Sequence, residues 1–408
     1  MFWGRKLPLK APRPVKYEPI PVIDLLMEMN VYSRLMLDLA YYSVVVKDTS
    51  IAYEVQRIED KLDADWSLLV MQASLAVRSA RDAEEMVSVY RMANALDKLS
   101  DSAADIAMLV IRNIGISEPV RAALLESEEV VTTIKVQNKG LEGFSVGRLY
   151  EIMTGFNILA IRRENYWIIN PSENEEIRLG DILIVRGTLD SLNTIANILG
   201  DKLALKKPLV EERENKIAKK IAYMKNITDV MIDLAFHAIV NNDKLAAIEV
   251  LNLEEIVDDT IHKMILTIIE KFHDNPEEAT GLLSFVISME NVADAAAELV
   301  TPLASNLPIH PIVKRVEEES IERIVRLKIP SNFKETPLGE LGLDELGAIP
   351  IAIYRGRKII PLPNENTVIK PGDILIVKIY SGMEENLNEK LDNYNIEIEG
   401  IEIEEEED

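Results

Sequence analysis

One hexapeptide occurs twice in the sequence: GDILIV fills residues 180–185 and returns letter for letter at residues 372–377. The match continues upstream without a gap, and 14 of 28 positions are identical between residues 158–185 and 350–377. Chance does not give this agreement, so the chain contains an internal duplication. Because the last four residues of the hexapeptide are isoleucine, leucine or valine, we expect a strand that is buried on both faces.

The surroundings of the hexapeptide predict a small sheet domain. Apolar runs at residues 158–161 and 167–169 read as two more strands, and the Asn-Pro-Ser sequence that follows has the chemistry of a turn. Upstream, residues 130–136 predict a strand and residues 145–154 a short helix. The order strand, helix and three strands therefore predicts two β-α-β-β-β domains, at residues 129–198 and 322–390.

The segments before each sheet domain have helical periodicity. Apolar residues recur at steps of three and four in residues 51–69, 92–106 and 285–299, a pattern that faces the core of a helical bundle. The pentapeptide at residues 36–40 also aligns with residues 231–235, so the helical part is duplicated as well. The fold class is therefore α+β, in which two three-helix bundles, at residues 22–115 and 209–301, alternate with the two sheet domains.

The two ends of the chain differ in charge. Residues 1–21 form an arm of prolines interleaved with lysine and arginine, which either packs on the protein's own acidic surface or contacts a membrane partner. Residues 393–408 end in a run of acidic residues, and we expect a solvated acidic tail.

Composition excludes several classes of function. A formal net charge of −24 argues against nucleic-acid binding through phosphate neutralisation. The chain has no cysteine, so it forms no disulfide and no thiolate metal site. No run reaches the 18 or more apolar residues of a membrane span, and we expect no signal peptide. We therefore expect a cytoplasmic protein, or one held at the membrane only through a transporter.

The sheet domains resemble the regulatory C-terminal domain of the TrkA and RCK proteins, which control potassium channels and transporters. The resemblance lies in a Gly-x-Leu helix start, an Ala-Ile-x-Arg strand, a proline turn and the hexapeptide. In this sequence these are Gly147 with Leu149, residues 160–163, Pro171 and residues 180–185, and then Gly339 with Leu341, residues 352–355, Pro363 and residues 372–377.

This resemblance implies that the sheet domains pair about a twofold axis and hold a small anionic ligand between them, which in some relatives is cyclic di-AMP. The pair forms either from the two copies in one chain or by exchange in a homodimer. Arg163 and Arg355 are the matched cations that we expect to meet the ligand, with Asn170, Pro171 and Pro363 shaping the groove. The alternative is that both arginines lie solvated on the surface.

Each bundle also carries two acidic pairs spaced four residues apart, which places both carboxylates of a pair on one helix face. The pairs are Glu59 with Asp63, Asp97 with Asp101, Glu254 with Asp258, and Glu290 with Asp294. Carboxylates that converge from neighbouring helices can hold hard cations or di-iron centres.

The bundles resemble PhoU, the helical regulator of phosphate uptake, whose acidic motif can bind iron or zinc clusters. Here Ser102 and Ala295 stand where PhoU usually has a histidine after the second acid. The resemblance implies a divalent metal such as iron, zinc or magnesium, and the alternative is a solvated acidic face.

We expect a regulator rather than an enzyme, because the sequence has no nucleophile elbow, phosphate-binding loop or dinucleotide fingerprint. The resemblances imply a ligand-sensing regulator of a membrane channel or transporter for potassium or another cation. An adaptor of phosphate uptake and a carboxylate-bridged metal protein remain as alternatives.

Overall fold

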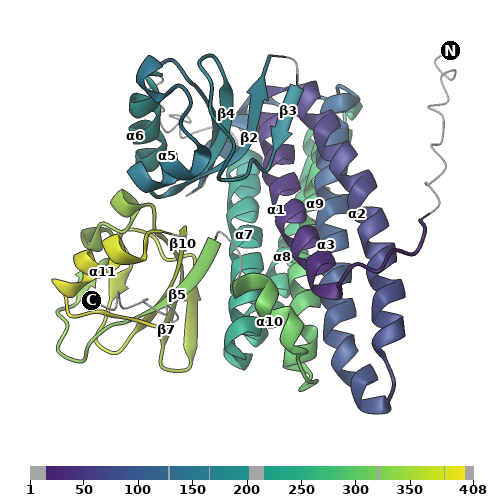
Figure 1. The fold of residues 1–408 in the computed structure, drawn as a ribbon. Coiled ribbons are helices and arrows are strands. Elements are labelled where there is room, and N and C mark those ends of the chain that lie inside the picture. The colour runs from purple at the N-terminus through teal and green to yellow at the C-terminus, as the bar shows by residue number, and fades with distance from the viewer. Residues whose placement is uncertain are drawn as a thin grey trace, which may run out of the picture.

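The computed structural model describes residues 15–126, 129–164, 166–201, 216–318, 322–380 and 382–399. Residues 1–14 of the basic arm, residues 400–408 of the acidic tail and residues 209–215 of the predicted second bundle lie outside these ranges. The long helices form one layer, and the two sheet domains lie against the same side of it, one above the other (Figure 1).

Side-chain caps mark where the second and third helices of the first bundle begin. Asp48 caps its second helix by accepting a hydrogen bond from the Ser50 backbone N–H, and Ser79 caps the third by accepting from that of Asp82. The predicted apolar stripe of the second helix is buried except for Trp66, which is half-buried. The three helices are α1 (Val22–Val46), α2 (Thr49–Ala76) and α3 (Ala80–Ile111).

The second bundle repeats this design. Asp243 caps its second helix as Asp48 caps the corresponding helix of the first bundle, and Asn275 caps the third. Pro302 lies in the last turn of that third helix. The bundles pack together through their third helices. The helices are α7 (Lys216–Asn241), α8 (Lys244–Lys271) and α9 (Pro276–Ala304).

The segments between bundles and sheet domains contain short helices. The helix after the first bundle packs on α7, and the helix after the second packs on α1 and α7. Each connector therefore contacts the opposite bundle and ties the two halves together. These elements are α4 (Glu118–Ala123), the 3-10 turn η1 (Leu124–Glu126) and α10 (Pro311–Glu318).

The first sheet domain has four antiparallel strands in the order β1-β4-β2-β3. The repeated hexapeptide leads into β4, which pairs with strands on both sides, as its apolar sequence predicts. A closing helix, α6, was not predicted. The elements are β1 (Val130–Lys135), η2 (Lys139–Leu141), α5 (Val146–Ile152), β2 (Phe156–Arg163), β3 (Tyr166–Ile169), β4 (Ile182–Gly187) and α6 (Leu189–Leu199).

The second sheet domain has the order β11-β5-β10-β7-β8. The predicted short α-helix is replaced by two 3-10 turns, because Gly342 and Gly347, both at positive φ, end each turn after three or four residues. The elements are β5 (Glu322–Lys328), β6 (Thr336–Pro337), η3 (Leu338–Leu341), η4 (Asp344–Leu346), β7 (Ile349–Arg355), β8 (Lys358–Pro361), β9 (Val368–Ile369), β10 (Ile374–Tyr380), α11 (Glu384–Asp392) and β11 (Glu397–Glu399).

The last four residues of the hexapeptide are all apolar because the strand that they form separates two cores. Leu183 and Val185 point into the core of the sheet domain itself, whereas Ile184 joins the large core of the bundles. Ile376, its counterpart in β10, also joins the bundle core. Alternation along one strand thus attaches each sheet to the helical layer. None of the helices among the described residues combines the length and apolar character needed to cross a bilayer.

Candidate functional site

The two sheet domains touch at a pair of equivalent glycines. A Cβ atom on Gly347 would lie 2.5 Å from the Cα atom of Gly155, and both glycines have positive φ values, of 80° and 85°. Beside them, the Thr188 hydroxyl donates to the carbonyl oxygen of Asp344 over 3.3 Å. Because the two glycines hold the same place in the two copies, the chain has a pseudo-twofold axis at this contact, and the sheet domains pair within one chain.

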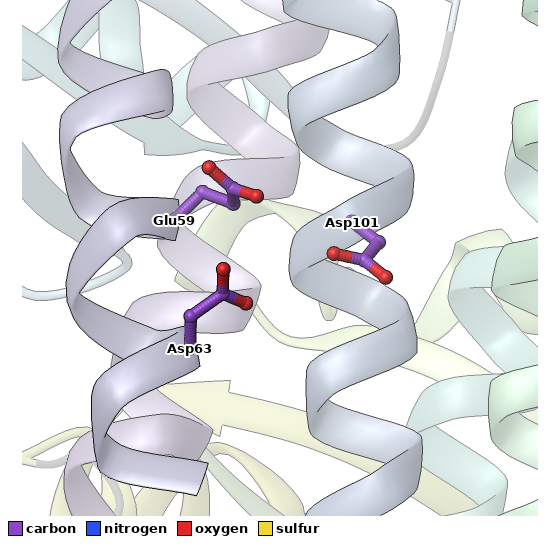
Figure 2. A group of neighbouring side chains, drawn as sticks. All are labelled: Glu59, Asp63 and Asp101. Atoms are coloured by element: carbon purple, nitrogen blue, oxygen red, sulfur yellow. The ribbon is translucent and has the colours of Figure 1, made fainter. Parts of the chain in front are cut away.

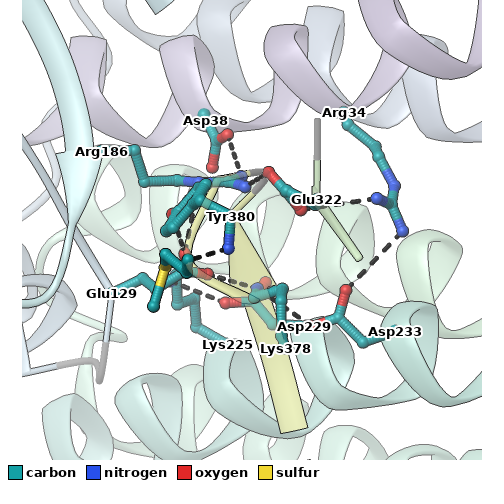
Figure 3. A network of polar contacts seen from close by, with 11 residues as sticks. Arg34, Asp38, Glu129, Arg186, Lys225, Asp229, Asp233, Glu322, Lys378 and Tyr380 are labelled. Carbon is teal, nitrogen blue, oxygen red and sulfur yellow. Dashed lines mark hydrogen bonds and ion pairs between the residues drawn. The ribbon is translucent and has the colours of Figure 1, made fainter. Parts of the chain in front are cut away.

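A set of charged side chains and one tyrosine, here called the junction network, lies where both sheet domains meet both bundles (Figure 3). Two of its members come from α1, three from α7, one precedes β1 and the rest come from β4, β5 and β10. They are Arg34, Asp38, Lys225, Asp229, Asp233, Glu129, Arg186, Glu322, Lys378 and Tyr380.

Arg186 and Lys378 are the central cations of the junction network. Arg186 pairs with Asp38 and Glu322 and lies 3.5 Å from Glu129, and its side chain is 9% exposed. Lys378 pairs with Glu129, and its Nζ atom lies 3.0 Å from a carboxylate oxygen of Asp233. Each cation therefore joins its own sheet domain to a bundle helix and to a carboxylate of the other half.

The junction network follows the duplication only in part. Arg186 and Lys378 both come directly after the hexapeptide, and Asp38 and Asp233 are matched in the aligned helical segments. Glu129 stands directly before β1, and Glu322, at the corresponding place of the second copy, is the first residue of β5 and pairs with Tyr380 of β10. The arginine at position 34, however, is replaced in the second half by an acid, Asp229.

Burial acts differently on the carboxylates of the junction network. Burial raises the pKa of Asp38 more than Arg186 lowers it, and burial likewise raises the pKa of Asp229 despite Lys225. For Glu129 burial is outweighed by Arg186 and Lys378, so its pKa lies well below the usual range. Glu129 is therefore held ionised, and Asp38 and Asp229 are the groups that resist ionisation.

Three small cavities adjoin the junction network. The central one, of about 40 Å³, is lined by residues from both bundles and both sheet domains. Two more, of about 50 and 40 Å³, are related by the duplication: Asn170 lines the first and Leu362 the second. Such volumes hold water molecules or an ion. They are far below the several hundred Å³ of typical ligand pockets, so none of the three holds a ligand of the size of cyclic di-AMP in this arrangement.

Arg163 and Arg355 have partners inside their own domains. Arg163 bonds Asp181 through two nitrogen atoms, at 3.0 and 2.8 Å, and Glu175 at 2.9 Å, and its side chain is 7% exposed. Arg355 bonds Asp373 at 2.9 and 2.7 Å. An anionic ligand would have to displace these carboxylates, so the geometry does not support our interpretation of either arginine as a ligand contact. Arg163 is not a solvated surface residue either.

The predicted groove residues lie beside the cavities. Asn170 has a φ value of 47° and lines one cavity, and Leu362 has a φ value of 49° at the matching place. Pro171 and Pro363 follow these positions and are partly buried. The proline turns therefore border the junction between a bundle and its sheet domain.

Acidic residues of α2 and α3 converge on one face of the first bundle (Figure 2). Glu59, Asp63 and Asp101 offer carboxylate oxygens that all lie within 4.8 Å of one another. Burial, and then Asp63 and Asp101, raise the pKa of Glu59 to about 7. Asp97 does not belong to this group of three carboxylates. Its pKa is nevertheless raised to about 6, by burial and then by Asp101 and Asp63.

A matching cluster lies on the second bundle. It consists of Glu254, Asp258 and Asp294 within the same 4.8 Å, with Glu290 nearby. Lys98 reaches across from α3, and its Nζ atom lies 2.5 Å from a carboxylate oxygen of Asp294. Each cluster thus offers only oxygen donors, which suit hard cations such as magnesium or manganese better than zinc. We name the two sets the first and second acidic clusters.

Sequence reasoning found the acidic clusters and missed the junction network. A signal for the network was present, because a charged residue interrupts an apolar run at the same place in both copies, at Asp38 and Asp233 and again at Arg186 and Lys378. What the sequence does not show is that helices and strands so far apart in the chain bring these charges together.

Comparison with known proteins assigns all four parts. The family model of the TrkA-C domain matches residues 131–200 and 323–391, and that of the PhoU domain matches residues 26–110 and 221–301. No curated protein matches the chain.

Solved structures similar to the chain include PhoU from Pseudomonas aeruginosa, at 13% identity and a TM-score of 0.40, with 70% of this chain and 96% of that one covered. PhoU from Streptococcus pneumoniae matches at 13% identity and a TM-score of 0.39, covering 69% and 92%. The GsuK RCK domain matches at 12% identity and a TM-score of 0.18, covering 76% and 79%.

Proposed function

We propose that this chain, which consists of two PhoU domains alternating with two TrkA-C domains, acts in the cytoplasm as a ligand-sensing regulator of a membrane transporter or channel for potassium or another cation. Both domain types belong to regulators of transport, of phosphate and of potassium respectively. The observation that carries the proposal is the junction network, which ties both TrkA-C domains to both PhoU bundles at one place.

The proposed mechanism is a population shift. A ligand that binds between the TrkA-C domains prefers an arrangement in which they are further apart, because the cavities of the closed arrangement are small. Separation of the domains breaks contacts of Arg186 and Lys378 with carboxylates of the other half. The bundles are then free to move relative to one another and present a different surface to the transporter.

A ligand screen and a transport assay together test this proposal. We expect one of cyclic di-AMP, ATP or ADP to raise the melting temperature of the protein and to change potassium flux in vesicles that contain its transporter. Melting temperatures that stay flat across all these ligands, together with a flux that is indifferent to the protein, would contradict it.

A second candidate is an adaptor of phosphate uptake, which the two PhoU domains favour. Deletion of the gene separates the candidates. Loss of phosphate control with intact potassium uptake would favour the adaptor, and the reverse result would favour the cation regulator.

The acidic clusters support a further proposal, that the PhoU bundles bind a divalent cation. Glu59, Asp63 and Asp101 would hold it in the first cluster, and the cation would supply positive charge that relieves the repulsion among these carboxylates. Elemental analysis of the purified protein tests this. We expect magnesium, manganese or iron at up to one ion per cluster, and the absence of any ion after purification and after soaking would refute it.

A further inference from the structure

We propose that the junction network is a proton-responsive latch: the closed arrangement takes up one proton from solvent, and a rise in pH releases the TrkA-C domains from the bundles. The latch would work whether or not the chain regulates a transporter, because it depends only on charges within the protein.

The first argument is the balance of charge. Among the described residues, the junction network contains five carboxylates: Asp38, Glu129, Asp229, Asp233 and Glu322. It contains four cations: Arg34, Arg186, Lys225 and Lys378. The formal excess is one negative charge, in a place from which most water is excluded. Buried charges are stable only when they are paired, so the closed arrangement favours neutralisation of one carboxylate.

The second argument is the position of the carboxylates. Glu129 contacts Lys378, the Tyr380 hydroxyl and Arg186, so it remains an anion. Asp233 lies between Arg34, at 3.6 Å, and Lys378, at 3.0 Å. Glu322 likewise lies between Arg186 and Arg34.

Asp38 and Asp229 each have one direct cation instead of two. Asp38 pairs with Arg186, which it shares with two other carboxylates, and Asp229 pairs with Lys225 at 2.7 Å. On the side of Asp229, the Lys225 ammonium also lies over the ring of Tyr41, 5.9 Å from its centroid. The direction of both aspartate pKa shifts, upward, agrees with this difference in partners.

The sign of the pH effect follows from these positions. When the domains separate, water hydrates all five carboxylates and their pKa values return toward the usual range near 4. The closed arrangement therefore binds more protons than the open one, and its advantage is lost as the pH rises through the pKa of the closed state. For one proton, the ratio of open to closed molecules grows about tenfold for each pH unit between the pKa of the open state, near 4, and that of the closed state, and it is constant at higher pH.

The distance between the TrkA-C domains measures the latch directly. The chain has no cysteine, so Asp190→Cys on α6 and Glu385→Cys on α11, both exposed, allow a pair of spin labels. In EDTA, between pH 5 and 9, we expect one short distance at low pH and a longer one whose population grows with pH. Sodium, potassium and choline chloride should give the same profile. A profile that is flat, or that depends on the cation, would overturn the proposal.

Isosteric variants test the charge balance. Asp38→Asn and Asp229→Asn each remove the excess charge, so either variant should stay closed at every pH. Lys378→Met raises the excess to two charges and should open at lower pH than the parent. The matched control is Asp259→Asn on the exposed face of α8, which should keep the parent profile. Folded Asn variants that both retain the parent profile would overturn the latch, and circular dichroism checks that they are folded.

Discussion

Gly155 and Gly347 face each other across the pseudo-twofold axis so closely that neither leaves room for a side chain. A Cβ atom on Gly155 would lie 2.9 Å from the carbonyl oxygen of Leu346 and 2.7 Å from the Ser191 hydroxyl. Real Cβ atoms do not approach backbone atoms of another domain this closely, so any substitution must move the two sheet domains apart.

We predict that Gly347→Ala destabilises the pairing of the sheet domains. Two effects add: an alanine at a φ value of 80° is strained, and its Cβ atom meets Gly155. Gly372→Ala is the matched control, because its φ value is 78° and nothing lies within 4 Å of its added Cβ atom. We expect a loss of about 3 kcal/mol in the free energy of unfolding for Gly347→Ala and about 1 kcal/mol for the control. Equal losses in urea titrations would show that the contact is unimportant.

We predict that Arg163 and Arg355 stabilise the folded protein. Arg163→Met leaves the carboxylate of Asp181, which is 2% exposed, without its main partner, and such a loss costs about 3 kcal/mol or more. Arg355 is 34% exposed, so water can replace it and Arg355→Met should cost less, about 1–2 kcal/mol. Chemical denaturation measures both. A stable Arg163→Met protein that has lost binding of an anionic ligand would restore the role that the sequence suggested for this residue.

In the absence of metal, repulsion among the carboxylates of the first acidic cluster should lower the stability of the protein. Glu59→Gln removes one of three carboxylates that lie within 4.8 Å, and relief of their repulsion should stabilise the protein by about 0.5–1 kcal/mol in EDTA at pH 8. The same variant should bind manganese more weakly. Glu84→Gln, at an exposed position of α3, is the control and should change neither quantity. A Glu59→Gln variant that is less stable without metal would mean that the cluster is held together by hydrogen bonds.

Much of the fold could be predicted because the same sequence pattern occurs in both halves of the chain. The hexapeptide predicted β4 and β10, and the apolar stripes predicted the long helices. The 3-10 turns η3 and η4 could not be predicted from the first copy, because Gly342, which ends η3 at a positive φ value, stands where the first copy has Tyr150. The acidic pairs could be predicted to share one face of each helix, because residues four apart lie on the same face, which is a local rule.

The ion pair of Arg163 could not be predicted, for the opposite reason. A cation at the edge of a strand suits a ligand and a structural ion pair equally well, and the choice depends on whether a carboxylate folds back onto it. Asp181, the second residue of the hexapeptide, does so. It also accepts a hydrogen bond from the backbone N–H of Arg178 at 2.9 Å, so the pair fixes the turn before β4. Such long-range closure is a property of the folded domain and has no local sequence pattern.

The two acidic clusters should differ in their affinity for metal. The ammonium group of Lys98 already contacts Asp294 in the second cluster, and the position that aligns with Lys98 in α9 is Asn291. A divalent cation must displace this ammonium from the second cluster only. We therefore predict tighter binding of manganese at the first cluster, and about tenfold tighter binding at the second in Lys98→Met, measured by calorimetric titration. Lys263→Met, which removes an exposed lysine of α8, should leave the titration unchanged, and identical titrations of all three proteins would contradict the prediction.

Asp243 should make the stability of the second bundle depend on acidity. Burial alone would raise its pKa, but the neighbouring His237, the backbone N–H of Ala246 and Tyr354 outweigh burial and lower it to about 2. A carboxyl group whose pKa is lower in the folded than in the unfolded protein stabilises the fold above the unfolded value, near 4, and this contribution is lost as the pH falls toward 2.

Asp243→Asn isolates this charge, because asparagine is as good a helix cap as aspartate. At pH 7 the free energy of unfolding of the variant should be about 1–2 kcal/mol lower than that of the parent, after allowance for partial exposure of the side chain. At pH 2.5 the difference should shrink to a few tenths of a kcal/mol. Asp48→Asn changes the matched cap of α2, whose side chain is 28% exposed compared with 14% for Asp243, and should show a smaller effect at both pH values. A deficit in Asp243→Asn that is the same at pH 7 and pH 2.5 would mean that the cap, rather than the charge held between His237 and Tyr354, is what stabilises this end of α8.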